Sequence, residues 1–288
     1  MRTALLSLLV AAPALACLWD SDTLKEEALR KKDVGDLVVG RVSQHSRTFY
    51  EEKVKYTQPL VDAGKAVAAR YDDLAVALDR LGRFDDAIAV MDAKALRFPG
   101  EYTTLANKGT FLAHRGSLPE ALELLRAAIA LNPNAHFGRE KYQVQAIEYA
   151  IALQADPTLS TKKDLLGNDL QTTEKVLFGD HGKYQKGFKT AFDKSGLNRD
   201  VFVGLAGIIQ FGSGLENPHI WLALGIVLAL DGDRSLAIRA LARAHALKHP
   251  AAAEHVRVLA RSVKEFSGNP DFVKLKNEFE QGQAVVAK

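Results

Sequence analysis

Two stretches of sequence decide the fold: Ala75-Val-Ala-Leu-Asp-Arg-Leu-Gly-Arg-Phe-Asp-Asp-Ala87 and Gly109-Thr-Phe-Leu-Ala-His-Arg-Gly-Ser-Leu-Pro-Glu-Ala121. They align without a gap at an offset of 34 residues, from position 75 to position 109. Their apolar residues recur at helical spacing. A gap-free repeat of this length predicts stacked helical hairpins, each of which buries its apolar face against the next.

Glycine and proline stand at matching places in the two copies and have definite structural tasks. Gly82 aligns with Gly116, where a left-handed residue would close the first helix of each hairpin. Pro99 aligns with Pro133, where proline would end the second helix because it cannot donate to the helical ladder. Ala121 is small enough to let the two helices approach closely.

A third copy occupies residues 218–251, which contain Trp221-Leu-Ala-Leu-Gly225 and a predicted N-cap at Asp233. In the second copy, Ser117 and Glu120 have the spacing of a capping box. The sequence therefore predicts a third hairpin further along the chain.

The flanking sequence indicates further helices. A helix is expected at 136–153, and another at 49–61 with an interruption near Pro59. Thr23 and Glu26 have the spacing of a capping box. The predicted division of the chain is a signal peptide at 1–16, an N-terminal helical segment at 17–66, hairpins with a closing helix at 67–155, a linker rich in helix breakers at 156–182, and a C-terminal helical region at 183–288.

Through residues 68–134 and 218–251 the chain resembles tetratricopeptide-repeat (TPR) proteins. The resemblance implies an all-α, TPR-type helical-hairpin solenoid with additional flanking helices. It also implies a groove, formed by the first helices of successive hairpins, that binds a protein or peptide partner. Carried over by position, the groove residues would be Asp72, Val76, Asp79, Arg80, Thr103, Asn107, Thr110, His114 and Lys141. The alternative is that many of these side chains only contact neighbouring helices.

One TPR class clamps a terminal carboxylate with groove lysine, asparagine and arginine. Asn107 and Lys141 fit that pattern, whereas Asp72 and Val76 stand where the class has lysine and asparagine. An aspartate would repel the carboxylate, so this clamp is not expected.

The first sixteen residues predict export. They carry one positive charge at Arg2, an apolar stretch too short to span a bilayer, and Ala14-Leu-Ala16 before a cleavage point. Cys17 would then begin the mature chain and is a candidate for lipidation, although Ala14 and Leu15 stand in the reverse of the usual lipobox order. We expect a protein of the periplasm or cell envelope that meets a membrane only through such an anchor.

A narrower resemblance joins this chain to a group of exported bacterial TPR proteins whose mature chain begins Cys-Leu-Trp-Asp, here Cys17-Leu-Trp-Asp20. These proteins share a segment like Ala135-His-Phe-Gly-Arg-Glu-Lys-Tyr142. The resemblance implies export and architecture, and no particular activity.

Composition and motifs disfavour other classes of function. The formal net charge is +3 and the basic residues are interleaved with acidic ones, which argues against nucleic acid as a partner. A single cysteine excludes an internal disulfide. The pairs His245 with His249 and His136 with Glu140 each share a helical face, but two ligands do not fill a zinc site; a cationic or hydrogen-bonding role at a helix end explains His249 more simply. Neither a metal nor a cofactor is therefore expected.

No nucleophile elbow, phosphate loop or dinucleotide turn is present in the sequence, and the chain is not expected to be an enzyme. Gly212-Ser-Gly214 is interpreted as the turn before a helix. Two alternatives to an exported scaffold stay open. One is an envelope-assembly lipoprotein anchored through Cys17. The other is a hydrolase with a site in the C-terminal helical region, built from Asp200, His181 or His219.

Overall fold

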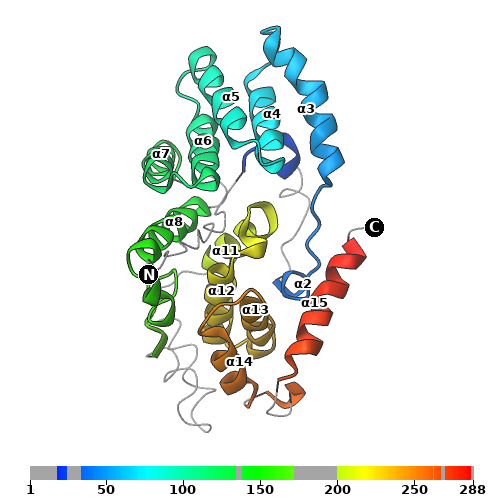
Figure 1. The fold of residues 1–288 in the computed structure, drawn as a ribbon, viewed down its shortest axis with the longest axis vertical. Coiled ribbons are helices and arrows are strands. Elements are labelled where there is room, and N and C mark those ends of the chain that lie inside the picture. Colours follow the sequence, from blue (N-terminus) through cyan, green and yellow to red (C-terminus); the bar gives the residue numbers. More distant parts are fainter. Residues whose placement is uncertain are drawn as a thin grey trace, which may run out of the picture.

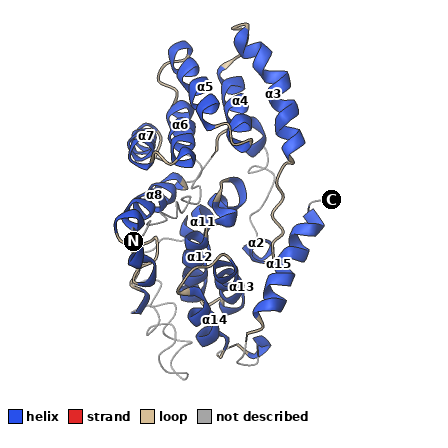
Figure 2. Ribbon diagram, viewed as in Figure 1, coloured by secondary structure: helices blue, strands red, loops and turns tan. Residues whose placement is uncertain are grey.

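The computed structural model describes residues 18–24, 34–133, 138–171, 200–261, 263–266 and 270–286. Within these residues the chain forms helices joined by loops, with one isolated bridge between Lys163 and Asp169 (Figure 2). The prediction of an all-α helical-hairpin fold is confirmed. The predicted signal peptide, Cys17, His136 and His181 lie outside the described residues.

The first arm of the molecule is a stack in which each helix packs on the next (Figure 1). Its helices are α3 (Arg47–Asp62), α4 (Ala68–Arg80), α5 (Phe84–Arg97), α6 (Tyr102–Arg115), α7 (Leu118–Leu131) and α8 (Glu140–Ala155). The two predicted hairpins are α4 with α5 and α6 with α7, and α4 also contacts α6. First helices of successive hairpins therefore lie side by side.

The glycines of these hairpins have the structural roles that the repeat predicts. Gly82 and Gly116 have φ values of 78° and 95°, in the left-handed region where glycine is favoured. A Cβ on Gly109 would come within 2.8 Å of Leu125 Cγ, so the close approach of α6 to α7 requires a residue without a side chain.

The second arm contains the third predicted hairpin. Its elements are α11 (Asp200–Phe211), the 3-10 turn η3 (Gly214–Glu216), α12 (Pro218–Asp231), α13 (Arg234–Ala246), α14 (Ala252–Ala260), the 3-10 turn η4 (Lys264–Phe266) and α15 (Phe272–Val286). Helix α12 is buried on every side from Ile220 to Leu230. Asp233 accepts a hydrogen bond from Leu236 N, which confirms the predicted cap of α13. Helix α8 contacts α11 and so connects the two arms.

A short helix near the start of the chain returns to the end of the chain. Helix α2 (Val34–Val38) contacts α11 and α13 (Figure 1). The turn that follows α2 packs against α15 so closely that a Cβ on Gly282 would lie 1.8 Å from Val39 O. Helix α2 and the turn after it are thereby joined to the second arm.

Several local predictions were wrong. Pro59 lies inside α3, which continues to Asp62 without interruption. Ser117 makes no capping bond, because its Oγ accepts hydrogen bonds from Arg115 instead. The cap of the turn at 21–24 is Asp20, which accepts from Thr23 N, rather than Thr23 itself.

The closing helix and the linker also differ in detail from the prediction. Helix α8 begins at Glu140, after Gly138 at a φ of 74°, and not at residue 136. The described part of the linker packs on α8 through the 3-10 helix η2 (Pro157–Thr161) and a hydrogen bond from Tyr149 Oη to Lys163 O, 2.8 Å long. Residues 172–182 of the predicted linker lie outside the described part.

Candidate functional site

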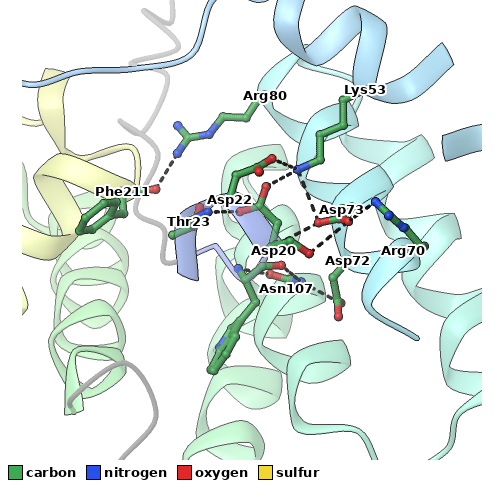
Figure 3. Close-up of polar contacts among 12 residues, drawn as sticks. Asp20, Asp22, Thr23, Lys53, Arg70, Asp72, Asp73, Arg80, Asn107 and Phe211 are labelled. Carbon is green, nitrogen blue, oxygen red and sulfur yellow. Dashed lines mark hydrogen bonds and ion pairs between the residues drawn. The ribbon is translucent and has the colours of Figure 1, made fainter. Parts of the chain in front are cut away.

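Residues 18–24, which we call the N-terminal segment, lie across the first helices of the hairpins (Figure 3). Asn107 of α6 holds the backbone of Trp19 at both ends. Its Oδ1 accepts from Trp19 N at 2.8 Å, and its Nδ2 donates to Trp19 O at 2.9 Å. A carboxamide can do both because it carries a donor and an acceptor side by side, like a neighbouring strand.

The aromatic ring of Trp19 and the side chain of Leu18 fill the adjoining space. Trp19 Nε1 donates to Tyr102 Oη at 3.2 Å, and the two rings meet edge to face with centroids 5.6 Å apart. Leu18 is fully buried in the hydrophobic core. The N-terminal segment is thus anchored by apolar contacts as well as by hydrogen bonds.

The acidic half of the N-terminal segment meets one lysine of α3 (Figure 3). Lys53 Nζ lies 2.6 Å from Asp20 and 2.7 Å from Asp22, and 3.5 Å from Asp73 of α4. Ser21 N donates to Asp73 Oδ1 at 2.9 Å. Burial alone would raise the pKa of Asp20, but the ion pair with Lys53 and the hydrogen bonds from Thr23 together outweigh it and leave that pKa below its ordinary value.

A second polar group fixes Asn107 in position. Asp72 accepts from Asn107 Nδ2 at 3.0 Å and from Lys94 Nζ at 2.7 Å. Lys94 is fully buried and also donates to Thr103 Oγ1. Because Asp72 accepts one amide hydrogen, the Asn107 carboxamide has a single orientation toward Trp19.

Asp79, His114 and Ser213 form a hydrogen-bonded chain that joins the two arms. Asp79 Oδ1 lies 2.6 Å from His114 Nδ1, and His114 Nε2 lies 2.8 Å from Ser213 Oγ. The Asp79 and His114 side chains are almost completely buried, at 2% and 3% exposed, whereas Ser213 is half-buried. The order carboxylate, imidazole and hydroxyl is that of a charge-relay triad.

Arg80 also joins the two arms (Figure 3). Its guanidinium donates to Phe211 O at 2.6 Å and to Gly212 O at 3.1 Å, which satisfies carbonyl groups at the C-terminal end of α11. Sequence reasoning placed Arg80 in a partner groove. In the structure its guanidinium instead donates to backbone carbonyls of the same chain.

The remaining predicted groove residues also contact the chain itself. Thr110 Oγ1 accepts from Gln143 of α8 at 2.9 Å, and Lys141 pairs with Asp200 of α11 at 2.7 Å. Val76 lies on a polar cavity of about 240 Å³ between the N-terminal segment, α3, α4 and α11. The cavity is lined by Asp20, Asp22, Thr23, Ser43, Gln44, His45, Arg47, Tyr50, Val76, Arg80, Gln210 and Phe211.

Glu140, at the start of α8, is a buried carboxylate next to the N-terminal segment. It is 2% exposed, and neither carboxylate oxygen has a hydrogen-bond partner in the described structure. Burial raises its pKa to about 7, an effect that the nearby Trp19 indole only partly offsets. Trp19 Nε1 itself donates to Tyr102. A buried acceptor without a donor is unusual and marks a place for a polar ligand group.

The sequence analysis did not identify Lys53, Asp73, Tyr102 and Glu140 as residues that contact or adjoin the N-terminal segment. The signal for them was the acidic and aromatic segment Leu18-Trp-Asp-Ser-Asp22, which was assigned to the mature N-terminus and not to the groove. Helix periodicity alone does not predict that a distant segment lies on a helix surface.

Histidines gather at a different place, between α12 and the end of α13. His219 and His249 have ring centroids 4.8 Å apart, and His219 also meets the Tyr149 ring edge to face. Burial lowers the pKa of His219 to about 4 and, together with the neighbouring histidines, that of His249 to about 3. Of the two roles expected for His249, the structure shows hydrogen bonding, since its Nδ1 accepts from Ala251 N, and the lowered pKa disfavours the cationic one. No group of three metal-ligating side chains occurs within the described ranges.

Comparison with known proteins agrees with this architecture. Residues 73–136 match the family model of the tetratricopeptide repeat, which spans both hairpins of the first arm. No curated protein matches the chain. The match supports tetratricopeptide repeats at residues 73–136, and the described helices form an all-α, TPR-type helical solenoid. Tetratricopeptide repeats generally mediate protein–protein interaction, which supports a scaffold role.

Proposed function

We propose that the protein is an exported scaffold that binds a protein partner through the surface formed by α3, α4, α6 and the start of α8, called below the first-helix surface. One observation supports this most. The first-helix surface holds the N-terminal segment of the chain by its backbone, through Asn107 and Trp19. A surface that binds one segment in this way has the groups needed to bind another.

Photo-crosslinking tests the proposal. A photoreactive residue replaces Tyr50, which lines the cavity beside the N-terminal segment, and as a control replaces Leu96, which is 89% exposed on α5. We expect a cross-linked partner from an envelope extract with the Tyr50 probe and not with the Leu96 probe. Equal products from both positions, or none from either, would contradict the scaffold function.

Export rests on the sequence of residues 1–16, and anchoring on Cys17. No described helix is long and apolar enough to cross a membrane. Intact mass of the protein from its native envelope fraction tests both proposals. A chain that begins at an unmodified Cys17 indicates a free exported scaffold, whereas a diacyl or triacyl addition favours the alternative of an envelope-assembly lipoprotein.

A hydrolase is the second candidate, and the chain Asp79–His114–Ser213 favours it. The residues considered from sequence do not form this site. Asp200 pairs with Lys141, and His219 lies against Tyr149 and His249. His114 oriented by Asp79 could accept the proton of Ser213 during attack on an ester carbonyl.

A fluorophosphonate probe tests this candidate, since it forms a covalent bond with an activated serine. Labelling that disappears in Ser213→Ala and His114→Gln would support a hydrolase. An unlabelled wild-type chain that retains its helical circular dichroism would retire it.

A further inference from the structure

We propose that the first-helix surface binds a partner peptide in which a basic residue precedes an aromatic residue followed by acidic residues, and that the N-terminal segment is a built-in occupant which this peptide displaces. The inference rests on the proposed scaffold function and gives the chemistry of its partner.

The backbone contacts recognise the main chain of the N-terminal segment in one direction. Asn107 pairs with both polar groups of the residue at position 19, and Asp73 accepts from the amide of the residue at position 21. These groups bind the peptide backbone and not a particular side chain. A partner peptide can therefore make the same bonds once the N-terminal segment has left.

Side-chain contacts set the order of aromatic and acidic residues. Tyr102 receives the indole of Trp19 both by a hydrogen bond and by an edge-to-face contact. Further along the segment, Lys53 forms ion pairs with the carboxylates of Asp20 and Asp22. A partner without an acidic residue there would leave Lys53 with only Asp73, at 3.5 Å.

The basic residue follows from what the N-terminal segment leaves unpaired. Glu140, at the start of α8, lies near the Trp19 indole of the segment. It is buried, and neither of its carboxylate oxygens has a hydrogen-bond partner in the described structure. A cationic side chain would supply the missing hydrogen bonds. The built-in occupant is thus an incomplete ligand for this surface.

Attachment to the same chain keeps the built-in occupant in place until a competitor binds. Only residues 25–33 separate the N-terminal segment from α2. A short tether raises the effective concentration of a segment to roughly the millimolar range. The apparent affinity for a partner peptide therefore equals the intrinsic affinity multiplied by the fraction of chains in which the surface is free.

The test uses the full chain and two labelled, N-acetylated peptides. The basic peptide is Lys-Leu-Trp-Asp-Ser-Asp-Thr-Leu, and the neutral peptide has Gln in place of Lys. The released variant carries Trp19→Ala and Asp20→Asn, and the matched control is Leu24→Ser, which changes an exposed residue of the same segment. Circular dichroism verifies that each variant is folded.

We expect the released variant to bind the basic peptide at least about 10-fold more tightly than the wild type or the Leu24→Ser control, because the tethered competitor is gone. The released variant should bind the basic peptide at least about 5-fold more tightly than the neutral peptide, because the basic peptide gains one charge-assisted hydrogen bond. Glu140→Gln in the released variant should abolish that preference. Lys53→Gln should weaken both peptides equally.

Equal affinity in the wild type and the released variant would overturn the displacement, and equal affinity for both peptides would overturn the role of Glu140. Binding of neither peptide overturns the whole proposal, as does a wild-type dimer that Trp19→Ala dissolves, since the segment would then bind a second copy. None of these results needs a natural partner. The cross-linking test of the scaffold function can therefore succeed while this one fails.

Discussion

The carboxamide of Asn107 holds the backbone of Trp19 through two hydrogen bonds, 2.8 Å and 2.9 Å long, across 88 residues of sequence. Asn107→Ala removes both bonds and leaves Asp72 with one donor fewer. Unsatisfied buried groups of this kind predict a loss of about 2 to 4 kcal/mol in the free energy of unfolding. Urea denaturation measures it, with Asn277→Ala on the exposed face of α15 as a control that should change little.

Arg80 satisfies two carbonyls at the end of α11, so its loss should weaken the contact between the arms. We expect Arg80→Ala to lower the free energy of unfolding by about 2 to 4 kcal/mol. Arg83→Ala is the matched control, because Arg83 makes only an exposed ion pair with Asp86, worth about 0 to 1 kcal/mol. Equal losses in the two variants would show that Arg80 does not join the arms.

Ala121 is fully buried in α7. It lies opposite Gly109 of α6, where the two helices are so close that a Cβ on Gly109 would clash with Leu125. Ala121→Leu should therefore overpack the hairpin and destabilise it by about 1 to 3 kcal/mol. Ala127→Leu, on the exposed side of the same helix, should leave the melting temperature nearly unchanged. An unchanged melting temperature for Ala121→Leu would mean that the repeat register is wrong.

The neutral pair His219 and His249 should make the fold sensitive to acid. Their pKa values lie near 4 and 3 in the folded state, against an ordinary value of 6.5. As pH falls below 6.5, the unfolded chain takes up protons that the folded chain refuses, so stability falls until the folded-state pKa values are reached. Each group contributes about 1.4 kcal/mol per pH unit in this window.

Replacement of both histidines by Gln should flatten the decline between pH 6.5 and pH 4, measured by chemical denaturation at each pH. The groups that face the histidine pair are Tyr149 of α8 and His255 of α14, and the double variant retains them. His45→Gln, an exposed histidine, serves as the control and should keep the wild-type slope. A decline as steep in the double variant as in the wild type would assign the acid sensitivity to other groups.

Glu140 should act in the opposite direction. Its pKa is raised from 4.5 to about 7, so the unfolded chain loses its proton first and stability falls as pH rises from about 4.5 to about 7. At 1.36 kcal/mol per unit, the full effect has an upper limit of about 3 kcal/mol above pH 7. Glu140→Gln should gain most of this at pH 8 and little at pH 4.5. A stability gain that does not depend on pH would refute the assignment.

The hairpins could be predicted from sequence because their determinants are local. Gly82, Gly116 and Asp233 act within a few residues of themselves, and all three have their predicted roles in the structure. The prediction failed at Ser117, whose hydroxyl could bond either to the backbone or to the neighbouring Arg115. Local rules do not decide between two such partners.

The contacts of the first-helix surface could not be predicted in the same way. Asn107 and His114 were placed on the correct helices, but their partners Trp19 and Ser213 come from segments with no repeat. Which distant segment covers a helix surface depends on the path of the whole chain. The unpaired state of Glu140 is equally invisible to sequence periodicity.

Hydrogen exchange at the amides of Trp19 and Ser21 tests most directly whether the first-helix surface holds the N-terminal segment by its backbone. Trp19 N donates to Asn107 and Ser21 N to Asp73, so both amides should exchange slowly. Asn107→Ala should abolish the protection at Trp19. Exchange of both amides in the wild type at the rate of an unstructured peptide would contradict the account.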